Sequence, residues 1–173
     1  MASKTKIAQG NSFVFCSALA FALAANCSIA SSALVTDAMY GNPRYGFSIH
    51  YPSELLAAEP ESDNGDGRKF HARHGSARIA VWAGDNALNQ TPAAIARDAE
   101  EDCGRRPAVY RLVKPTVVAV SCITSTGGVV YRKTLIRGDI LTSLLATYSA
   151  SERSVWDPVV QRMAQSLTPG RPD

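Results

Sequence analysis

The sequence predicts an α+β protein, a three-layer α/β/α sandwich around a central, mostly antiparallel sheet of about six or seven strands. Three observations predict this class. Apolar, β-branched segments follow one another over residues 117–148 with short turns between them, which indicates an antiparallel meander. Apolar residues occur on both faces of the last segment, so both faces of the sheet must be covered. Two amphipathic stretches, over residues 91–103 and 152–166, supply the covering helices.

The first expected strand covers residues 46–51. Phe47, Ile49 and Tyr51 alternate there with polar residues, and Pro52 stops the strand. Alternation of this kind gives the strand one apolar face, which we expect to point into the core.

A short connection separates this strand from a hairpin. We expect one helical turn over residues 53–56 and an acidic, glycine-containing loop over residues 59–67. The hairpin pairs residues 68–74 with residues 77–83 and turns at Gly75.

The helix in the middle of the chain has clear start signals. Thr91 supplies a capping side chain, and Pro92 occupies the first helical position. Ile95, Ala99 and Cys103 then recur at steps of four, so they share one face of the helix. We expect that face to pack on the sheet.

The meander follows this helix. We expect strands over residues 109–113, 117–123, 129–136 and 140–148, with a two-residue hairpin turn at Gly138-Asp139. On the last strand, four apolar residues lie on one face (Ile140, Leu144, Ala146 and Tyr148) and two on the other (Leu141 and Leu145).

A C-terminal helix is expected over residues 152–166. Trp156, Val159 or Val160, Met163 and Leu167 form one apolar stripe at spacings of three and four. The Asp157-Pro158 pair is an alternative start for this helix, as a cap followed by a first-turn proline, and the stripe is the same for either start.

The N-terminus has the pattern of a secretory signal peptide over residues 1–30. Two lysines stand within the first six residues, and the apolar run over residues 13–25 is too short to span a membrane. Small residues follow it, and we expect cleavage after Ala30, with Ala33 as the alternative. The protein is therefore expected in the periplasm or outside the cell, in contact with the membrane only transiently through the signal peptide.

Cys27 allows another outcome. Residues 23–27 resemble a bacterial lipobox, which would attach a lipid to the cysteine. Asn26, however, stands where lipoboxes have a small residue, so we expect ordinary cleavage.

The remaining chain has the length of one domain. We expect a flexible leader over residues 31–39, a single domain over residues 40–168 and a disordered tail over residues 169–173. We expect the protein to be a monomer.

The charge balance is close to neutral. Loss of Lys4 and Lys6 with the signal peptide reduces 18 basic residues to 16, against 15 acidic residues, which leaves a net charge of +1. No field of one sign directs such a chain to nucleic acid or to anionic lipid, so we expect no nucleic-acid partner.

Two of the four cysteines, Cys16 and Cys27, leave with the signal peptide. The remaining pair, Cys103 and Cys122, predicts a disulfide, because an even pair in an oxidising compartment usually forms one. Cys103 lies on the packed side of a helix end and Cys122 lies in a strand, which suits a bridge. The alternative is a pair of buried free thiols or one reactive thiol.

Four segments together resemble the PsbP/Mog-like superfamily. They are Gly46 to Ser53, the Asp66-Gly67 pair, the strand Val129 to Lys133, and the helix from Asp157 to Met163 that ends at Ser166-Leu167. The resemblance spans about Tyr40 to Leu167 and implies a small exported bacterial member of a group with an α/β/α sandwich. Members of this group mostly act as non-catalytic binding or assembly proteins. The resemblance implies no catalytic residue.

The sequence carries no clear catalytic or metal motif. His50, His71 and His74 are its only histidines, and His71 and His74 point to opposite faces of one strand. A zinc or copper site needs more ligands than they supply. Ser121 and Cys122 lie inside a strand, and no G-x-S-x-G elbow occurs.

Two short motifs have simpler explanations. Residues 63–67 look like a calcium loop, but the alternating oxygen ligands and the closing glutamate are absent. Residues 137–139 spell the Arg-Gly-Asp adhesion tripeptide, but a tight hairpin turn accounts for them.

We therefore expect an exported binding or assembly domain that is not an enzyme, needs no cofactor and contacts a protein of the cell envelope. The alternatives are a periplasmic carrier of a small molecule or metal ion and, third, a hydrolase. Exposed arginine and aromatic side chains often form binding faces. On this chain the candidates are Arg44, Tyr45, Trp82, Arg105 and Arg106.

Overall fold

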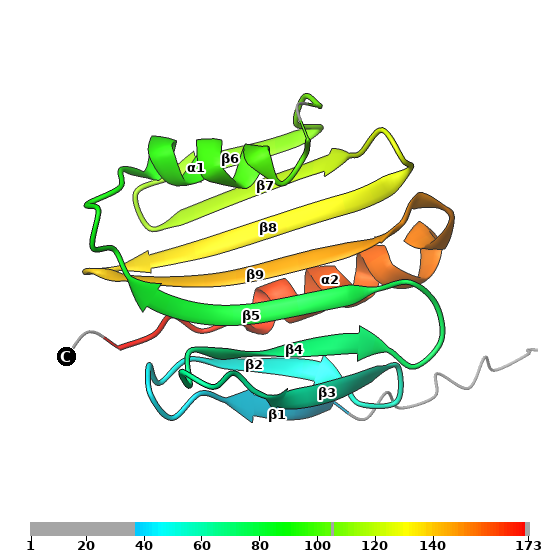
Figure 1. Cartoon of the computed structure of the whole chain (residues 1–173), viewed down its shortest axis with the longest axis horizontal. Coiled ribbons are helices and arrows are strands. Elements are labelled where there is room, and N and C mark those ends of the chain that lie inside the picture. The colour runs from blue at the N-terminus through cyan, green and yellow to red at the C-terminus, as the bar shows by residue number, and fades with distance from the viewer. Residues whose placement is uncertain (1–36, 105, 172–173) are drawn as a thin grey trace, which may run out of the picture. The chain divides into compact units, whose positions relative to one another are not determined.

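A seven-stranded antiparallel sheet forms the centre of the fold (Figure 1). The computed structural model describes residues 37–104 and 106–171. In chain order the strands of this sheet are β3 (Leu56–Glu61), β4 (Gly67–Ala72), β5 (Arg78–Asp85), β6 (Tyr110–Lys114), β7 (Val117–Ile123), β8 (Gly128–Arg137) and β9 (Ile140–Ser149). Their order in space is β3-β4-β5-β9-β8-β7-β6, and every neighbouring pair is antiparallel.

Three further elements cover this sheet. Helix α1 (Pro92–Glu101) packs on β6 and β7 on one face. Helix α2 (Arg153–Ser166) and a separate two-stranded sheet of β1 (Asp37–Gly41) and β2 (Ser48–Pro52) cover the other face. Figure 1 shows α1 in front of β6 and β7, and α2 behind β5 and β9. The predicted α+β sandwich is confirmed, with the small sheet as an addition to one outer layer.

The apolar residues on both faces of β9 belong to two different cores. Ile140, Leu144, Ala146 and Tyr148 pack in the core beneath α2 and the small sheet. Leu141 and Leu145 pack against the core beneath α1. The alternation along this one strand therefore indicated correctly that both faces are covered.

Helix α1 begins as its sequence predicts. The Thr91 hydroxyl accepts a hydrogen bond from the backbone N–H of Ala94 at 3.2 Å, and Pro92 is the first helical residue. Cys103, just beyond the helix, forms the predicted disulfide with Cys122 of β7, with 5.9 Å between their Cα atoms. Both cysteines are buried, so the bridge joins α1 to the sheet inside the core.

Helix α2 starts at Arg153, so the earlier of the two expected starts holds and Pro158 lies inside the helix. Its buried stripe is Trp156, Val159, Val160, Met163 and Ala164. Asp157 faces the sheet, where it accepts a hydrogen bond from the Tyr148 hydroxyl at 2.7 Å.

Two expected irregular segments are strands. Residues 56–61, expected as the end of a helical turn and an acidic loop, form β3 at the edge of the sheet. Residues 37–39, expected in a flexible leader, belong to β1, which pairs with β2 from Asp37 to Pro52. Both are short strands that gain their order from pairing, which the local sequence does not reveal.

The segment expected as a disordered tail packs back onto the fold as far as it is described. The backbone N–H of Gly170 donates to Thr142 Oγ1 at 2.8 Å, and that of Arg171 donates to the Tyr45 carbonyl at 2.8 Å. Just before it, Thr168 and Ser48 exchange backbone and side-chain hydrogen bonds.

The expected signal peptide over residues 1–30, its cleavage after Ala30 and the first part of the leader lie outside the described residues, as does Arg105. Within the two described ranges, neither helix is long and apolar enough to cross a membrane.

Candidate binding site

Each face of the large sheet is covered over one part only. On the first face, α1 packs over β6 and β7, and β4 and β5 have no helix above them among the described elements. On the second face, α2 and the small sheet pack over β4, β5, β9 and part of β8, and β6 and β7 extend beyond them. The two open parts therefore lie on opposite faces and towards opposite edges of the sheet. Each carries a concave site.

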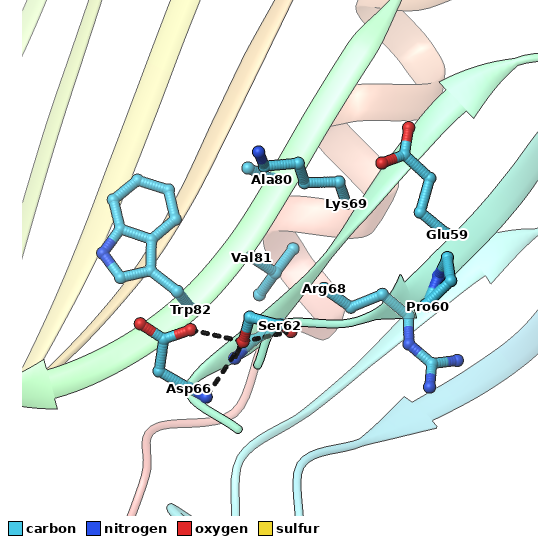
Figure 2. A pocket seen from close by; sticks show the side chains of 10 residues that line it. Glu59, Pro60, Ser62, Asp66, Arg68, Lys69, Ala80, Val81 and Trp82 are labelled. Atoms are coloured by element: carbon cyan, nitrogen blue, oxygen red, sulfur yellow. Dashed lines mark hydrogen bonds between the residues drawn. The ribbon is translucent and has the colours of Figure 1, made fainter. Parts of the chain in front are cut away.

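The first open part contains a pocket of about 350 Å³ between β3, β4 and β5. Figure 2 shows Trp82 beside Asp66 at one end of it, and Lys69 and Glu59 towards the other. Trp82 is half-buried because its strand position points to the face that α1 only partly covers.

The pocket floor is held by a serine. Ser62 Oγ donates to Asp66 Oδ1 at 2.6 Å and accepts from the backbone N–H groups of Asp66 and Gly67 at 3.1 Å each (Figure 2). Chiefly through this hydrogen bond, the pKa of Asp66 is lower than its ordinary value. Asp66 is therefore ionised at neutral pH, but its oxygens are committed to Ser62 and Asn64.

One ring face of Trp82 is occupied by an arginine. The Arg132 guanidinium lies 5.5 Å from the ring centroid, and Arg132 Nη1 is 3.2 Å from Asp102 Oδ2. These contacts connect Trp82 to the end of α1 and fix the indole. The Nε atoms of Arg132 and of the pocket residue Arg68 are buried without a hydrogen-bond partner among the described residues.

The residues expected to form one binding face lie on different sides of the molecule. Trp82 is on the face that carries α1. Tyr45 packs against the core on the opposite side, and Arg44 lies over its ring and donates to the Asn64 carbonyl. Arg106 follows α1 and donates its backbone N–H to the Cys103 carbonyl. The structure therefore brings Arg44 and Tyr45 into contact but does not gather all four residues, Arg44, Tyr45, Trp82 and Arg106, on one face.

The second open part contains a larger cleft, of about 480 Å³. Strand register brings its floor together: Tyr110 of β6 lies opposite Ser121 of β7, which lies opposite Tyr131 of β8. Helix α2 forms its wall with Val160, Gln161, Ala164 and Gln165. We take this cleft, between α2 and strands β6 to β8, as the candidate site and call it the α2 cleft.

The charged groups of the α2 cleft are already paired. Lys133 Nζ donates to the Ala164 carbonyl at 2.5 Å, in the last turn of α2, where an unpaired carbonyl and the helix dipole favour a cation. Asp157 accepts from the Tyr148 hydroxyl and from Arg153. These bonds fix α2 on the sheet.

Burial changes the titration of several groups here. Desolvation lowers the pKa of Lys133 below its ordinary value. The pKa of Tyr131 is raised to about 12, mainly by burial and to a smaller extent by the neighbouring Tyr110. Burial and the hydrogen bond to Asp157 raise the pKa of Tyr148. A cleft that collects shifted groups is a good candidate for a functional site.

The neutral polar groups of the cleft have no partner. Within residues 37–104 and 106–171, no protein atom hydrogen-bonds to the hydroxyls or amides of five lining side chains, namely Tyr110, Ser121, Tyr131, Gln161 and Gln165. Apolar walls from Val129 and Val160 surround them. Neutral donors and acceptors that have no partner within the protein, set among apolar walls, can recognise a ligand or a partner protein through hydrogen bonds and apolar contact.

The titratable side chains of the α2 cleft are three tyrosines, Lys133, Arg153 and Asp157. No histidine, cysteine or glutamate lines it, and its one carboxylate, Asp157, is held by two partners. Elsewhere His71 Nδ1 lies 3.2 Å from Glu59 Oε1, and no cluster of three metal-ligating side chains occurs in the described part of the chain.

Sequence reasoning named Ser121, Tyr148 and Val160 of this cleft only as strand or helix residues, and it did not identify the cleft itself. One signal was present: Tyr131 and Lys133 stand on the same face as Val129 and Leu135, so polar ends interrupt an apolar strand face. The other lining residues are far apart in sequence and meet only through strand register and the placement of α2.

Comparisons with known proteins support the fold. No family model matches the sequence, and no curated protein matches it. The structure is similar to the solution structure of cyanobacterial PsbP (CyanoP) from Synechocystis sp. PCC 6803, with a TM-score of 0.58 over 82% of this chain and 97% of that chain. Sequence identity is 7%, so the likeness shows the PsbP-like fold alone.

Proposed function

We propose that this chain is an exported, non-catalytic binding domain that supports an assembly in the bacterial cell envelope, and that the α2 cleft contacts its protein partner. The observation that carries the proposal is the set of five neutral polar side chains without protein partners around this cleft. Their arrangement suits recognition by hydrogen bonds. Lys133 and Asp157, which could act as acid or base, are each committed to bonds within the fold.

Three further features support the proposal. The PsbP-like fold belongs to a group whose members mostly act in binding and assembly, as the sequence resemblance implies. The signal-peptide pattern at the N-terminus favours a periplasmic or secreted protein. The Cys103–Cys122 disulfide is typical of an oxidising compartment.

Site-specific crosslinking in cells tests the proposal. A photo-reactive amino acid replaces Gln161 on the wall of the α2 cleft in a tagged copy, and a matched copy carries it at Leu88, which is 82% exposed in the loop before α1. We expect one reproducible protein adduct from position 161 and none from position 88. Equal adducts from both positions, or none from position 161 when a control complex is trapped, would count against the proposal.

A small-molecule carrier is the second candidate, because a cleft of about 480 Å³ has the size of many ligand sites. Native mass spectrometry of protein purified from the exported fraction separates the two functions. A carrier retains an additional small mass that Tyr131→Ala releases, whereas an assembly domain shows the mass of the chain alone.

A further inference from the structure

The edge strand β6 borders the α2 cleft and is less protected than the other edge of the sheet. Its protection consists of its length of five residues, its two cations, Arg111 and Lys114, and the neighbouring helix α1. The large sheet has two edges, β3 and β6. Strand β3 contains Pro60 and a register irregularity between Ala58 and Glu61, both of which hinder pairing with a further strand. Strand β6 contains no proline and pairs with β7 in an unbroken register. Figure 1 shows β6 as the last strand of the sheet, behind α1.

The register identifies the free backbone groups of β6. The Ile136 N–H donates to the Thr116 carbonyl, so alternation along β7 directs Val118 and Val120 to β8 and Ala119 and Ser121 to β6. The β6 partners of these last two are Leu112 and Tyr110.

The residues between them, Arg111 and Val113, must therefore direct their N–H and C=O groups away from the sheet. Within the described parts of the chain, no side chain, turn or loop bonds to these groups. They form a short template for a further strand.

The side chains of β6 continue the floor of the α2 cleft to this edge. Tyr110 lines the cleft and is 49% exposed, and Leu112 shares its face. A strand added along β6 would place alternate side chains beside Tyr110 and Leu112, at the distance of ordinary cross-strand pairs. The added strand would thus pair with the backbone of β6 and also place side chains in the α2 cleft.

The charges of β6 indicate which charge its partner should carry. The strand carries Arg111 and Lys114 and no acidic residue. Arg111 is paired with Glu100 at 2.7 Å, and Lys114 has no partner among the residues that the structure describes. Strand β6 of a second copy has no acidic residue to place opposite Lys114, whereas a peptide that carries a carboxylate there is favoured.

We infer that the partner adds an extended peptide segment to β6 as a new edge strand, bonded to the backbone of Arg111 and Val113, with alternate side chains over Tyr110 and Leu112 and a carboxylate opposite Lys114. The inference rests on the proposed function and gives its partner a binding mode. Extended peptides bind other proteins in this way, with backbone bonds for affinity and alternate side chains for specificity.

A displayed library of random dodecapeptides, selected on the folded chain, supplies the probe. Binding of the selected peptides is then measured for the unaltered chain, for Arg111→Pro and for the matched Arg111→Ala. Proline removes the arginine side chain and an N–H that points away from β7, so the ladder with β7 remains, whereas alanine removes the side chain alone. We expect the selected peptides to alternate apolar and polar residues, as a strand does, and to contain an acidic residue. Arg111→Pro should lose at least about tenfold in affinity for these peptides, and Arg111→Ala should not.

Amide hydrogen exchange on the unaltered chain gives an independent readout if Arg111→Pro does not fold. A bound peptide should slow exchange at Arg111 and Val113, while Leu112, which already bonds to β7, changes little. Peptide binding without slower exchange at these two amides, or with full affinity in a folded Arg111→Pro, would overturn the inference.

The outcomes separate the inference from the proposed function. An adduct from position 161 with no selected peptide would leave the binding function standing and reject strand addition. Concentration-dependent dimers that Arg111→Pro abolishes would assign the edge to a second copy and reject a peptide partner. If position 161 gives no adduct and no peptide is selected, both the proposed function and strand addition are rejected.

Discussion

The Cys103–Cys122 disulfide joins the end of α1 to β7 across a sequence separation of 19 residues. We expect its loss to lower the free energy of unfolding by about 3 kcal/mol, because a closed loop of about 20 residues removes roughly 11 cal/mol/K of entropy from the unfolded chain. For a domain of this size the same change lowers the melting temperature by about 10 °C.

Urea unfolding of the oxidised protein, of the reduced protein and of the Cys103→Ala/Cys122→Ala double variant tests this value. Reduction keeps every sulfur atom in the core, so it measures the crosslink alone. Because both cysteines are buried, the double variant adds a packing loss of roughly 1 kcal/mol. Equal unfolding midpoints for the oxidised and reduced proteins would refute the loop-entropy argument.

Three other predictions concern the pocket and the α2 cleft. A Cβ on Gly67 would lie 2.1 Å from a backbone carbonyl oxygen of β5, whereas a Cβ on Gly84 would meet no atom within 4 Å. In denaturant unfolding, Gly67→Ala should therefore lower the free energy of unfolding by more than about 2 kcal/mol. Gly84→Ala should lower it by less than about 0.5 kcal/mol. The pKa of Asp66 lies below its ordinary 3.8, so its contribution to stability is present above that pH and lost as the pH falls further. Ser62→Ala should raise that pKa in an NMR titration. The raised pKa of Tyr148 keeps it neutral while the unfolded chain ionises near pH 10, so stability should fall above pH 10, and less steeply in Tyr148→Phe.

The glycine prediction is contradicted if Gly67→Ala and Gly84→Ala lose the same free energy of unfolding in denaturant. The Asp66 prediction is contradicted by a titration that Ser62→Ala does not shift. The tyrosine prediction is contradicted by parallel stability curves above pH 10 for Tyr148→Phe and the unaltered chain.

The second half of the chain was readable from the sequence because its signals are local. Alternation, a hairpin turn and a capped helix each involve neighbouring residues, and the strand over residues 117–123 was predicted with the bounds that β7 has in the structure. The disulfide followed from the parity of the cysteines and from the placement of Cys103 at a helix end.

The edges of the fold were not readable in this way. Strand β3 has Glu59 and Pro60 in its centre, which are typical of a loop and also of a protected edge strand. Only its pairing with β4 decides between the two. Strand β1 likewise depends on β2.

The candidate site was the least readable part. Tyr110, Tyr131, Gln161 and Gln165 are ordinary surface residues in the sequence, and their significance comes from their common position around one cleft. That position depends on the register of three strands and on the placement of α2, which no local pattern specifies.

The hydrogen bonds between Ser48 and Thr168 join residues 120 positions apart. The layer that begins with β1 and β2 is thus closed by the last part of the chain, and β5 pairs with β9 across the whole of α1 and β6 to β8. Such a topology has a high contact order, so we expect slow folding, on the millisecond-to-second scale. A ribosome releases the N-terminal strands long before their C-terminal contacts exist. Strand β5 cannot pair with β9, and Ser48 cannot bond to Thr168, until the last part of the chain has been made, so we expect the final fold only after that point.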